Sequence, residues 1–344
     1  MVRIASVDTF RFFAVVAIII IHTTAFDPDI SPYNQFYLYA YIISDQLSRF
    51  AVPFFFIIAG YFWGVKINQG GDLVKISLKM AKRIGIIFIA WNFIYLLPIN
   101  LNIIINLGMT DAINLAYSHA IDLIQHPVTL IMQGTKIHLW FLIGILSALL
   151  ITTFFVYIKN LPMLVIVAIG LYFFGVLAKA YSDTPIGIDI NFNTRNGPFF
   201  STILFVTGYL TSQKKPTLYW MKYGIWIFSF GCILHFTEIF TLWVMFGTWP
   251  KHDFVFGTYF MGLGTAFIAL SNHPLFQYKI LGKIGNVSLG VYAVHYIFVD
   301  LLLPIDKASD NIMWEISFVL LVFLLSLMAT ILLAKNKYTR KIVI

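Results

Sequence analysis

Charged side chains are scarce in this sequence of 344 residues, since Asp, Glu, Lys and Arg together make up only 11% of it. Soluble domains average about 25% charged residues. Hydrophobic residues account for 60% of the chain, and its mean hydropathy is +0.85. These values exclude an ordinary soluble fold and predict a protein that buries apolar surface in a lipid bilayer.

Cysteine is nearly absent, because Cys232 is the only one in the sequence. One thiol forms neither an internal disulfide nor a cysteine-based zinc site, and its apolar neighbours favour a small buried hydrophobic residue. The sequence also lacks a Walker loop, a G-x-S-x-G motif and a dinucleotide-binding fingerprint. The corresponding nucleotide-binding and serine hydrolase chemistries are therefore not expected.

Apolar runs of roughly 20 residues recur along the chain, and each is long enough to cross a hydrocarbon core of about 30 Å. We predict an all-α polytopic transmembrane helical bundle that forms a single domain over residues 1–344. No small-residue cleavage site follows the first run, so the first helix is expected to be retained. The more polar segment from Gly108 to Gly134 is expected to be interfacial or re-entrant. The ten expected transmembrane helices lie near 7–26, 42–64, 84–107, 138–158, 161–180, 197–213, 222–246, 254–272, 284–304 and 312–334.

Lysine and arginine are divided unevenly between the two sides of this predicted bundle. The side that holds the N-terminus carries 17 of the 23 basic residues, whereas eight aspartates gather on the other side. The positive-inside rule therefore predicts that both termini are cytoplasmic. The net charge of +8 is thus expected to orient the protein in the membrane rather than to bind nucleic acid.

Arg11 and His22 lie in the first apolar run, separated by 11 residues. In a helix this spacing returns to within about 20° of the same face and rises about 16 Å. We expect Arg11 near the cytoplasmic interface, paired with Asp8, and His22 deep in the membrane. A snorkelling arginine and a packing histidine are the alternative interpretation.

Other ionisable residues are expected to converge in the outer half of the bundle. Such groups are expensive inside a membrane unless they face a cavity or a partner, so each is a functional candidate. A purely structural contact between helices is the alternative for Glu238 and His295. The candidates are His138 at the start of the fourth helix, Arg195 and Asn196 at the start of the sixth, Glu238 in the seventh, Arg49 near the start of the second and His295 in the ninth.

Five segments of the sequence resemble motifs of the bacterial acyltransferase family 3. The members of this family are integral-membrane acyltransferases that modify surface polysaccharides. Arg11 and His22, in SVDTFRFFAVVAIIIIH, reproduce the R-x10-H pattern of that family. The TRNG segment looks most similar to the branch that O-acetylates enterobacterial common antigen. The other matching segments are RFAVPFFFIIAGYF at 49–62, HLWFL at 138–142, TRNGPFFSTILFVTGYL at 194–210 and SLGVYAVHYIF at 288–298.

The sequence departs from the family pattern in two places. Many relatives have Ser-Gly-Tyr where this chain has Ala59-Gly60-Tyr61. The basic R-x-x-R pair of the family appears here as Lys79 and Lys82 followed by Arg83. Because lysine binds phosphate as a point charge, the second departure weakens bidentate phosphate binding at this position.

The resemblance implies a multi-pass enzyme of the bacterial inner membrane that uses acetyl-CoA as a substrate and has no permanently bound cofactor or metal. The acetyl group would pass to a hydroxyl of a cell-surface polysaccharide or of its lipid-linked sugar precursor. In catalysis, we expect His22 as general base or acyl relay, Glu238 to orient it, and Arg195 to stabilise the oxyanion. For binding, we expect Arg11, Lys79, Lys82 and Arg83 at the acyl-CoA, and His138, Trp140, Arg49, Asn196 and His295 at the sugar.

Two other functions fit the same residues. A transporter or flippase for a lipid-linked sugar or anion also lines its pathway with Arg, His and Glu, although repeat symmetry and paired broken helices are not found in the sequence. A structural or regulatory subunit of a polysaccharide-export complex is the third interpretation. It predicts that His22 tolerates substitution.

Overall fold

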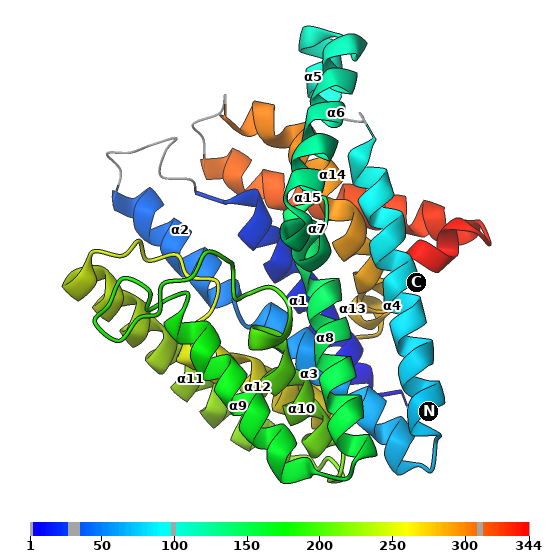
Figure 1. The fold of residues 1–344 in the computed structure, drawn as a ribbon, viewed down its shortest axis with the longest axis vertical. Coiled ribbons are helices and arrows are strands. Elements are labelled where there is room, and N and C mark those ends of the chain that lie inside the picture. The colour runs from blue at the N-terminus through cyan, green and yellow to red at the C-terminus, as the bar shows by residue number, and fades with distance from the viewer. Residues whose placement is uncertain (1–2, 27–34, 98–100, 308–311, 344) are drawn as a thin grey trace.

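The computed structural model describes residues 3–26, 35–97, 101–307 and 312–343 (Figure 1). These residues form helices and contain no strand, which confirms the all-α prediction. The α-helices are α1 (Ala5–Thr23), α2 (Gln35–Ser48), α3 (Ala51–Asn68), α4 (Leu73–Leu96), α5 (Leu101–Leu107), α6 (Met109–Gln125), α7 (Pro127–Gln133), α8 (Trp140–Tyr157), α9 (Leu161–Leu177), α10 (Pro198–Thr211), α11 (Tyr219–Phe246), α12 (Phe256–Leu270), α13 (Lys279–Gly285), α14 (Ser288–Lys307) and α15 (Ile312–Lys335). The 3-10 helices are η1 (Ile137–Leu139), η2 (Pro274–Phe276) and η3 (Thr339–Ile342).

Six helical segments of the described chain are long and apolar enough to cross a membrane. They are Ala5–Thr23, Gln35–Asn68, Ile137–Tyr157, Tyr219–Phe246, Ser288–Ile305 and Met313–Lys335. Leu161–Leu177, Pro198–Thr211 and Phe256–Leu270 are shorter apolar helices. The protein is thus built as a multi-pass membrane protein, while ten spans with two cytoplasmic ends remain a prediction.

The second expected helix, 42–64, is interrupted at Arg49 and Phe50, which form the turn between α2 and α3. Pro53 explains the break, because proline has no N–H to donate to the carbonyl of Arg49, four residues earlier. The turn places the Arg49 side chain inside the bundle, where it is 8% exposed. The break therefore positions a charged residue that an uninterrupted apolar helix would have directed elsewhere.

The third expected helix, 84–107, is wrong in its position. α4 begins at Leu73, where the Asp72 side chain accepts a hydrogen bond from the backbone N–H of Lys75, and it ends at Leu96. Leu97 is extended, as expected for a residue that precedes proline. The apolar window missed the first turns of α4 because they are rich in lysine. Residues 101–107 form the separate helix α5.

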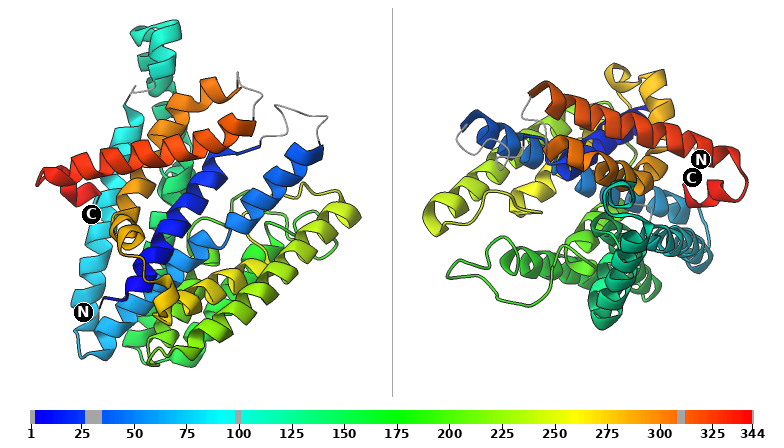
Figure 2. Two further views of the ribbon diagram at one scale, coloured as in Figure 1. Left: turned by 180° about the vertical axis from the view of Figure 1, so that it is seen from behind. Right: turned by 90° about the horizontal axis from the view of Figure 1, so that it is seen from above.

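Helix α1 runs through the middle of the bundle and contacts α2, α3, α12, α13, α14 and α15 (Figures 1 and 2). Helices α3 and α10 approach unusually closely beside it. A methyl group on Gly60 would lie 2.0 Å from the carbonyl oxygen of Phe205, and one on Gly208 would lie 1.9 Å from that of Ile57. Small residues at such a crossing let two membrane helices pack backbone to backbone.

Helices α5 and α6 project beyond the rest of the bundle at the top of Figure 1. This region includes the segment from Gly108 to Gly134, which was expected to be interfacial or re-entrant. It forms the two helices α6 and α7, and of their residues Ala112 and Leu123 are buried. The structure contains no membrane, so its interfacial location stays a prediction.

Candidate active site

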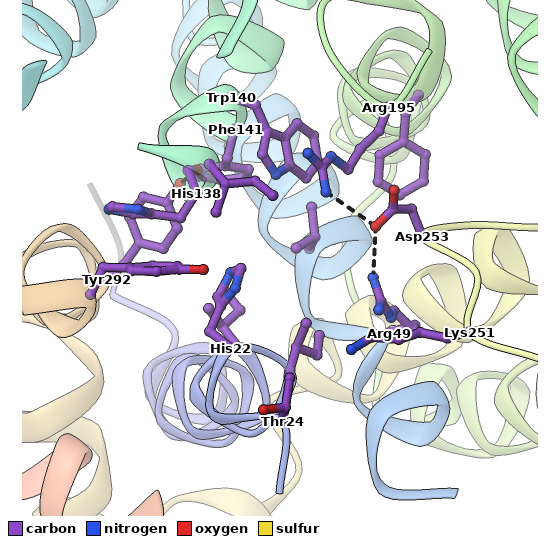
Figure 3. Close-up of a pocket in the computed structure, with 16 residues that line it drawn as sticks. His22, Thr24, Arg49, His138, Trp140, Phe141, Arg195, Lys251, Asp253 and Tyr292 are labelled. Carbon is purple, nitrogen blue, oxygen red and sulfur yellow. Dashed lines mark hydrogen bonds and ion pairs between the residues drawn. The ribbon is translucent and has the colours of Figure 1, made fainter. Parts of the chain in front are cut away.

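A cavity of about 230 Å³, lined by both charged and apolar side chains, lies inside the bundle (Figure 3). Its walls come from α1, the α2–α3 turn, η1, α8, α14 and the loops that precede α10 and α12. The residues that line it are Ile18, Ile21, His22, Thr24, Arg49, Val52, Ile137, His138, Trp140, Phe141, Arg195, Phe200, Lys251, Asp253, Tyr292 and Tyr296. Five of the residues singled out in the sequence, His22, Arg49, His138, Trp140 and Arg195, therefore meet in one chamber.

His22 reaches this cavity from the last turn of α1. The helix ends at Thr23, and Thr24 adopts the left-handed conformation with φ 48°. His22 is thus near the end of its helix rather than deep within it. In Figure 3 its ring points into the space that faces the arginine side chains.

Asp253 joins two arginines on the opposite wall of the cavity (Figure 3). Its Oδ1 accepts hydrogen bonds from Nη1 of Arg49 and from Nη1 of Arg195, each at 3.1 Å. Arg49 also makes a two-pronged contact with the carboxylate of Asp45, at 2.9 Å from Nε and 2.8 Å from Nη2. Lys179 Nζ lies 3.7 Å from Asp253 Oδ2. The carboxylate of Asp253 is thus shared by three cations.

The charge environment of Asp253 keeps it ionised. Burial alone would raise the pKa of this carboxyl group, but the positive charges of Arg195, Arg49 and Lys179 outweigh burial and hold its pKa well below the usual range. A permanently charged Asp253 fixes both guanidinium groups at the cavity wall. The two arginines therefore face the cavity in a fixed arrangement.

The segment TRNGP explains how Arg195 is positioned. Thr194 donates from its hydroxyl to the carbonyl of Gly175 at 2.7 Å, which anchors the loop to α9. Gly197 has φ 72°, a conformation that glycine tolerates best, and Pro198 then opens α10. Arg195 therefore sits directly before the helix, with its guanidinium 5.0 Å from the ring centroid of Trp140.

Aromatic and imidazole rings form the remaining wall. The His138 ring stacks on Tyr296 with 5.0 Å between the centroids and 15° between the planes. The hydroxyl of Tyr292 donates to the backbone carbonyl of His138. His295 lies 5.0 Å from His138 and 5.2 Å from His22 between ring centroids. No group of ligating side chains in the described part of the chain is arranged to hold a metal ion.

Three of the residues expected for catalysis or sugar binding do not line the cavity. Glu238 accepts hydrogen bonds from the Tyr181 hydroxyl at 2.8 Å and from the backbone N–H groups of Phe256 and Gly257 at 3.1 and 2.6 Å. It therefore caps the start of α12 and does not contact His22. Asn196 donates to Gln133 at 3.4 Å beside the cavity. His295 lies behind His22 rather than at the cavity surface.

The expected donor-binding residues lie apart from the cavity. Arg11 donates to Asp8 Oδ1 at 2.9 Å, which confirms the predicted pair, and its charge interacts with that of Arg83. Lys79, Lys82 and Arg83 are exposed on one face of α4. We call these four basic residues, Arg11, Lys79, Lys82 and Arg83, the basic cluster.

Four phenylalanine rings form a chain of contacts from the cavity wall to the start of α1. Phe141 lines the cavity and lies 6.2 Å from Phe55 between ring centroids. Phe55 lies 5.6 Å from Phe54, which lies 6.3 Å from Phe10, the residue before Arg11. Along α1 the cavity lining begins only at Ile18. These contacts link the start of α1 to the cavity wall through packed rings, and an open passage from Arg11 to His22 stays a prediction.

Sequence reasoning missed Lys251, Asp253 and Tyr292. The first two lie in the loop between α11 and α12. The only signal was the polar sequence Lys251-His252-Asp253 between two apolar helices. Tyr292 lies in the segment SLGVYAVHYIF, three residues before His295, and thus almost on the same face of α14.

The bundle and its chamber define a multi-pass membrane protein with a histidine and a fixed arginine pair facing one internal cavity. The chain belongs to acyltransferase family 3, because the profile of this family's Acyltransferase domain matches residues 4–335. The chain therefore carries the membrane-embedded domain of an acyltransferase family.

Two curated relatives, both described as amino-acid racemases from Enterococcus faecalis, are similar to the chain. They are 27% identical over 243 residues and 25% identical over 248 residues. Each match covers 67% of this chain but only 31% and 32% of the relatives, so the chain spans about a third of their length. No solved structure matches the chain.

Proposed function

We propose that this membrane acyltransferase moves an acetyl group from acetyl-CoA to a hydroxyl of a cell-surface polysaccharide or of its lipid-linked sugar precursor. Residues 1–344 act as one domain in the bacterial inner membrane, with both termini in the cytoplasm. The observation that carries the proposal is the placement of His22 in a cavity opposite Arg49 and Arg195. A base facing a fixed pair of cations is what hydroxyl attack on a thioester needs.

His22 acts as the general base in this proposal. It takes the proton from the acceptor hydroxyl while the hydroxyl oxygen bonds to the thioester carbonyl carbon. The negative charge on the carbonyl oxygen is stabilised by Arg195. The carbon–sulfur bond then breaks, and the proton on His22 passes to the leaving thiolate to give CoA and the acetyl ester.

Cavity shape and charge support a small sugar unit as the acceptor. A volume of about 230 Å³ holds one sugar ring, and the wall combines polar groups with the rings of Trp140, Tyr292 and Tyr296. Aromatic faces and charged hydrogen-bonding groups together suit a carbohydrate. The TRNG segment, which supplies Arg195, favours enterobacterial common antigen as the polymer that contains this sugar.

The donor is proposed to bind with its phosphates at the basic cluster. From there a pantetheine arm must cover the rise of about 16 Å between Arg11 and His22. If the arm passes along the rings that connect Phe10 to Phe141, Phe54 and Phe55 must move apart to admit it. The donor would thus open its own passage from the cytoplasmic side.

Purified protein incubated with radiolabelled acetyl-CoA and candidate glycans tests this function. We expect label on the glycan, and we expect His22→Ala to abolish it. His126→Ala is the matched control, because His126 is exposed between α6 and α7 and does not line the cavity. Sugar flux into liposomes without CoA, combined with no label transfer, would instead establish a transporter.

A further inference from the structure

His295 lies directly behind the proposed base. Its ring centroid is 5.2 Å from that of His22, with 36° between the ring planes. His295 is fully buried and does not line the cavity, whereas His22 does. A residue in this position touches the base from the rear and is out of contact with anything held in the cavity.

The hydrogen bonding of His295 fixes its tautomer. Its Nδ1 lies 2.5 Å from the backbone carbonyl oxygen of Tyr292. A carbonyl oxygen only accepts, so Nδ1 must carry the hydrogen, and Nε2 of the neutral ring is left with a lone pair. Among the described residues, this buried Nε2 has no hydrogen-bond partner. A buried acceptor without a partner is unfavourable and calls for a functional explanation.

We propose that His295 is a positioning residue for His22. Its Nε2 accepts a hydrogen bond from the ring N–H of His22 through one bridging water molecule. This contact fixes the tautomer of His22 so that its other nitrogen presents a lone pair to the cavity. The inference rests on the proposed role of His22 as general base and adds the group that orients it.

During the reaction His295 stays neutral. The acceptor proton moves to the cavity-facing nitrogen of His22 and later to the thiolate of CoA, so no proton is left on His295. Its hydrogen bond with His22 strengthens while His22 carries the positive charge. The chain from the Tyr292 carbonyl through His295 to His22 thus does what a carboxylate does in a catalytic triad.

Nearby carboxylates are committed elsewhere. Asp253 is held by Arg49 and Arg195, and Asp300 accepts from Lys136 Nζ at 2.6 Å. Glu238, the residue expected from sequence to orient His22, is bound to Tyr181 and the start of α12. His295 is therefore the candidate that the geometry favours for this role.

Three substitutions test the inference. His295→Gln places an acceptor oxygen where Nε2 was, His295→Asn keeps only a donor near the Tyr292 carbonyl, and His295→Phe keeps neither. We expect Gln to retain kcat within about fivefold, and Asn and Phe to lose about 100-fold in kcat, with KM for acetyl-CoA unchanged. A merely structural role for the Tyr292 contact predicts the reverse order, with Asn better than Gln, and that result would overturn the inference.

His235 provides the control. It is also a buried histidine, but its ring nitrogens contact Thr258 and Gln46 at 3.0 Å each, outside the cavity. The same substitutions there are expected to lower the melting temperature without a selective loss of kcat in the folded fraction. If the wild-type protein transfers no label, the proposed function fails. If wild type is active, His22→Ala is inactive and His295→Phe is fully active, only the positioning role fails.

Nitrogen NMR of wild-type protein labelled at histidine gives a second test, in which the measured molecule is the wild type. The signals of His295 are assigned by their loss in His295→Gln. We expect a protonated Nδ1 and an unprotonated Nε2. An Nε2–H tautomer of His295 would contradict the inference.

Discussion

Arg195 donates from Nη1 to Oδ1 of Asp253 at 3.1 Å, and this contact ties the loop before α10 to the loop before α12. Neither loop shares a helix with His22, yet the two together form the wall opposite it (Figure 3). The catalytic geometry thus depends on an ion pair between segments that lie 58 residues apart in the sequence.

Asp253→Asn is expected to reduce both stability and activity. The change removes the negative charge that Arg49, Arg195 and Lys179 share, so the three cations repel one another. Loss of one partner from a largely buried pair costs about 3 kcal/mol. Thermal unfolding in detergent and kcat for acetyl transfer measure the two effects. Asp122→Asn is the control, because its pair with His126 is exposed, and equal effects at both positions would contradict the prediction.

Glu238→Gln is expected to destabilise the protein without a selective loss of catalysis. The Gln amide nitrogen is a donor and would face the backbone N–H of Phe256 or of Gly257, so one hydrogen bond is lost. A buried donor left without an acceptor lowers the free energy of unfolding by about 1 to 3 kcal/mol. We expect a lower melting temperature and, below it, a kcat within about threefold of wild type. A loss of kcat as large as that of His22→Ala, in folded protein, would restore the catalytic role first expected for Glu238.

Gly208→Ala is expected to loosen the contact between α3 and α10. The added methyl group would lie 1.9 Å from the carbonyl oxygen of Ile57 and 2.7 Å from the backbone nitrogen of Tyr61, so the helices must separate. Overpacking of this kind costs about 1 to 3 kcal/mol, seen as a lower melting temperature. Gly170→Ala in α9 is the matched control, since a methyl group there meets no atom within 4 Å. No difference between the two variants would rule out the tight crossing.

Acidification is expected to destabilise the protein through His252. Burial, helped by the charge of Arg49, lowers the pKa of His252 to about 4. In the unfolded chain the pKa of this histidine is near 6.5. Between pH 6.5 and 4 the unfolded state therefore binds more protons than the folded state. Each pH unit of acidification in this range lowers the free energy of unfolding by up to about 1.4 kcal/mol. Unfolding measured at pH 7, 6 and 5 should show this slope. His252→Gln should flatten it and His126→Gln should not, and parallel slopes in both variants would contradict the assignment.

Neutralising the basic cluster is expected to weaken donor binding selectively. One exposed charge is removed by each of the substitutions Lys79→Gln, Lys82→Gln and Arg83→Gln. An exposed ion pair with a phosphate contributes up to about 1 kcal/mol, so each variant should raise KM for acetyl-CoA by up to about fivefold. The effect should shrink at high salt, and kcat should change little. Lys214→Gln and Lys215→Gln, beyond the end of α10, serve as controls. A loss confined to kcat would place the donor elsewhere.

Local hydropathy predicted most of the helices because each needs an apolar run to face lipid or other helices. It missed the break at Arg49, because the mean hydropathy of a window of residues does not depend on whether Pro53 has a backbone N–H. It also shifted the third helix, because the lysines at the start of α4 lower the apolar average while an Asp72 cap still begins the helix there. Local chemistry, rather than hydropathy, sets those two positions.

The site was predicted where chemistry and position agreed. His22, His138 and Arg195 were chosen as ionisable residues in or beside apolar runs, and all three face the cavity. Glu238 met the same criterion, but it binds backbone N–H groups at the start of α12. The sequence alone does not indicate which distant N–H groups a carboxylate binds in the folded protein. Asp253 was missed for the converse reason, since an acidic loop residue gains meaning only when two arginines reach it.

The chain of phenylalanine contacts from Phe10 to Phe141 has an electrical consequence. A chamber with three histidines near it, if joined to water on both sides of a bilayer, would let protons cross and discharge the gradient that the membrane maintains. Phe10, Phe54, Phe55 and Phe141 carry no group that forms a hydrogen bond, so a proton cannot pass from ring to ring. Where these rings are in contact, they insulate the chamber on that side.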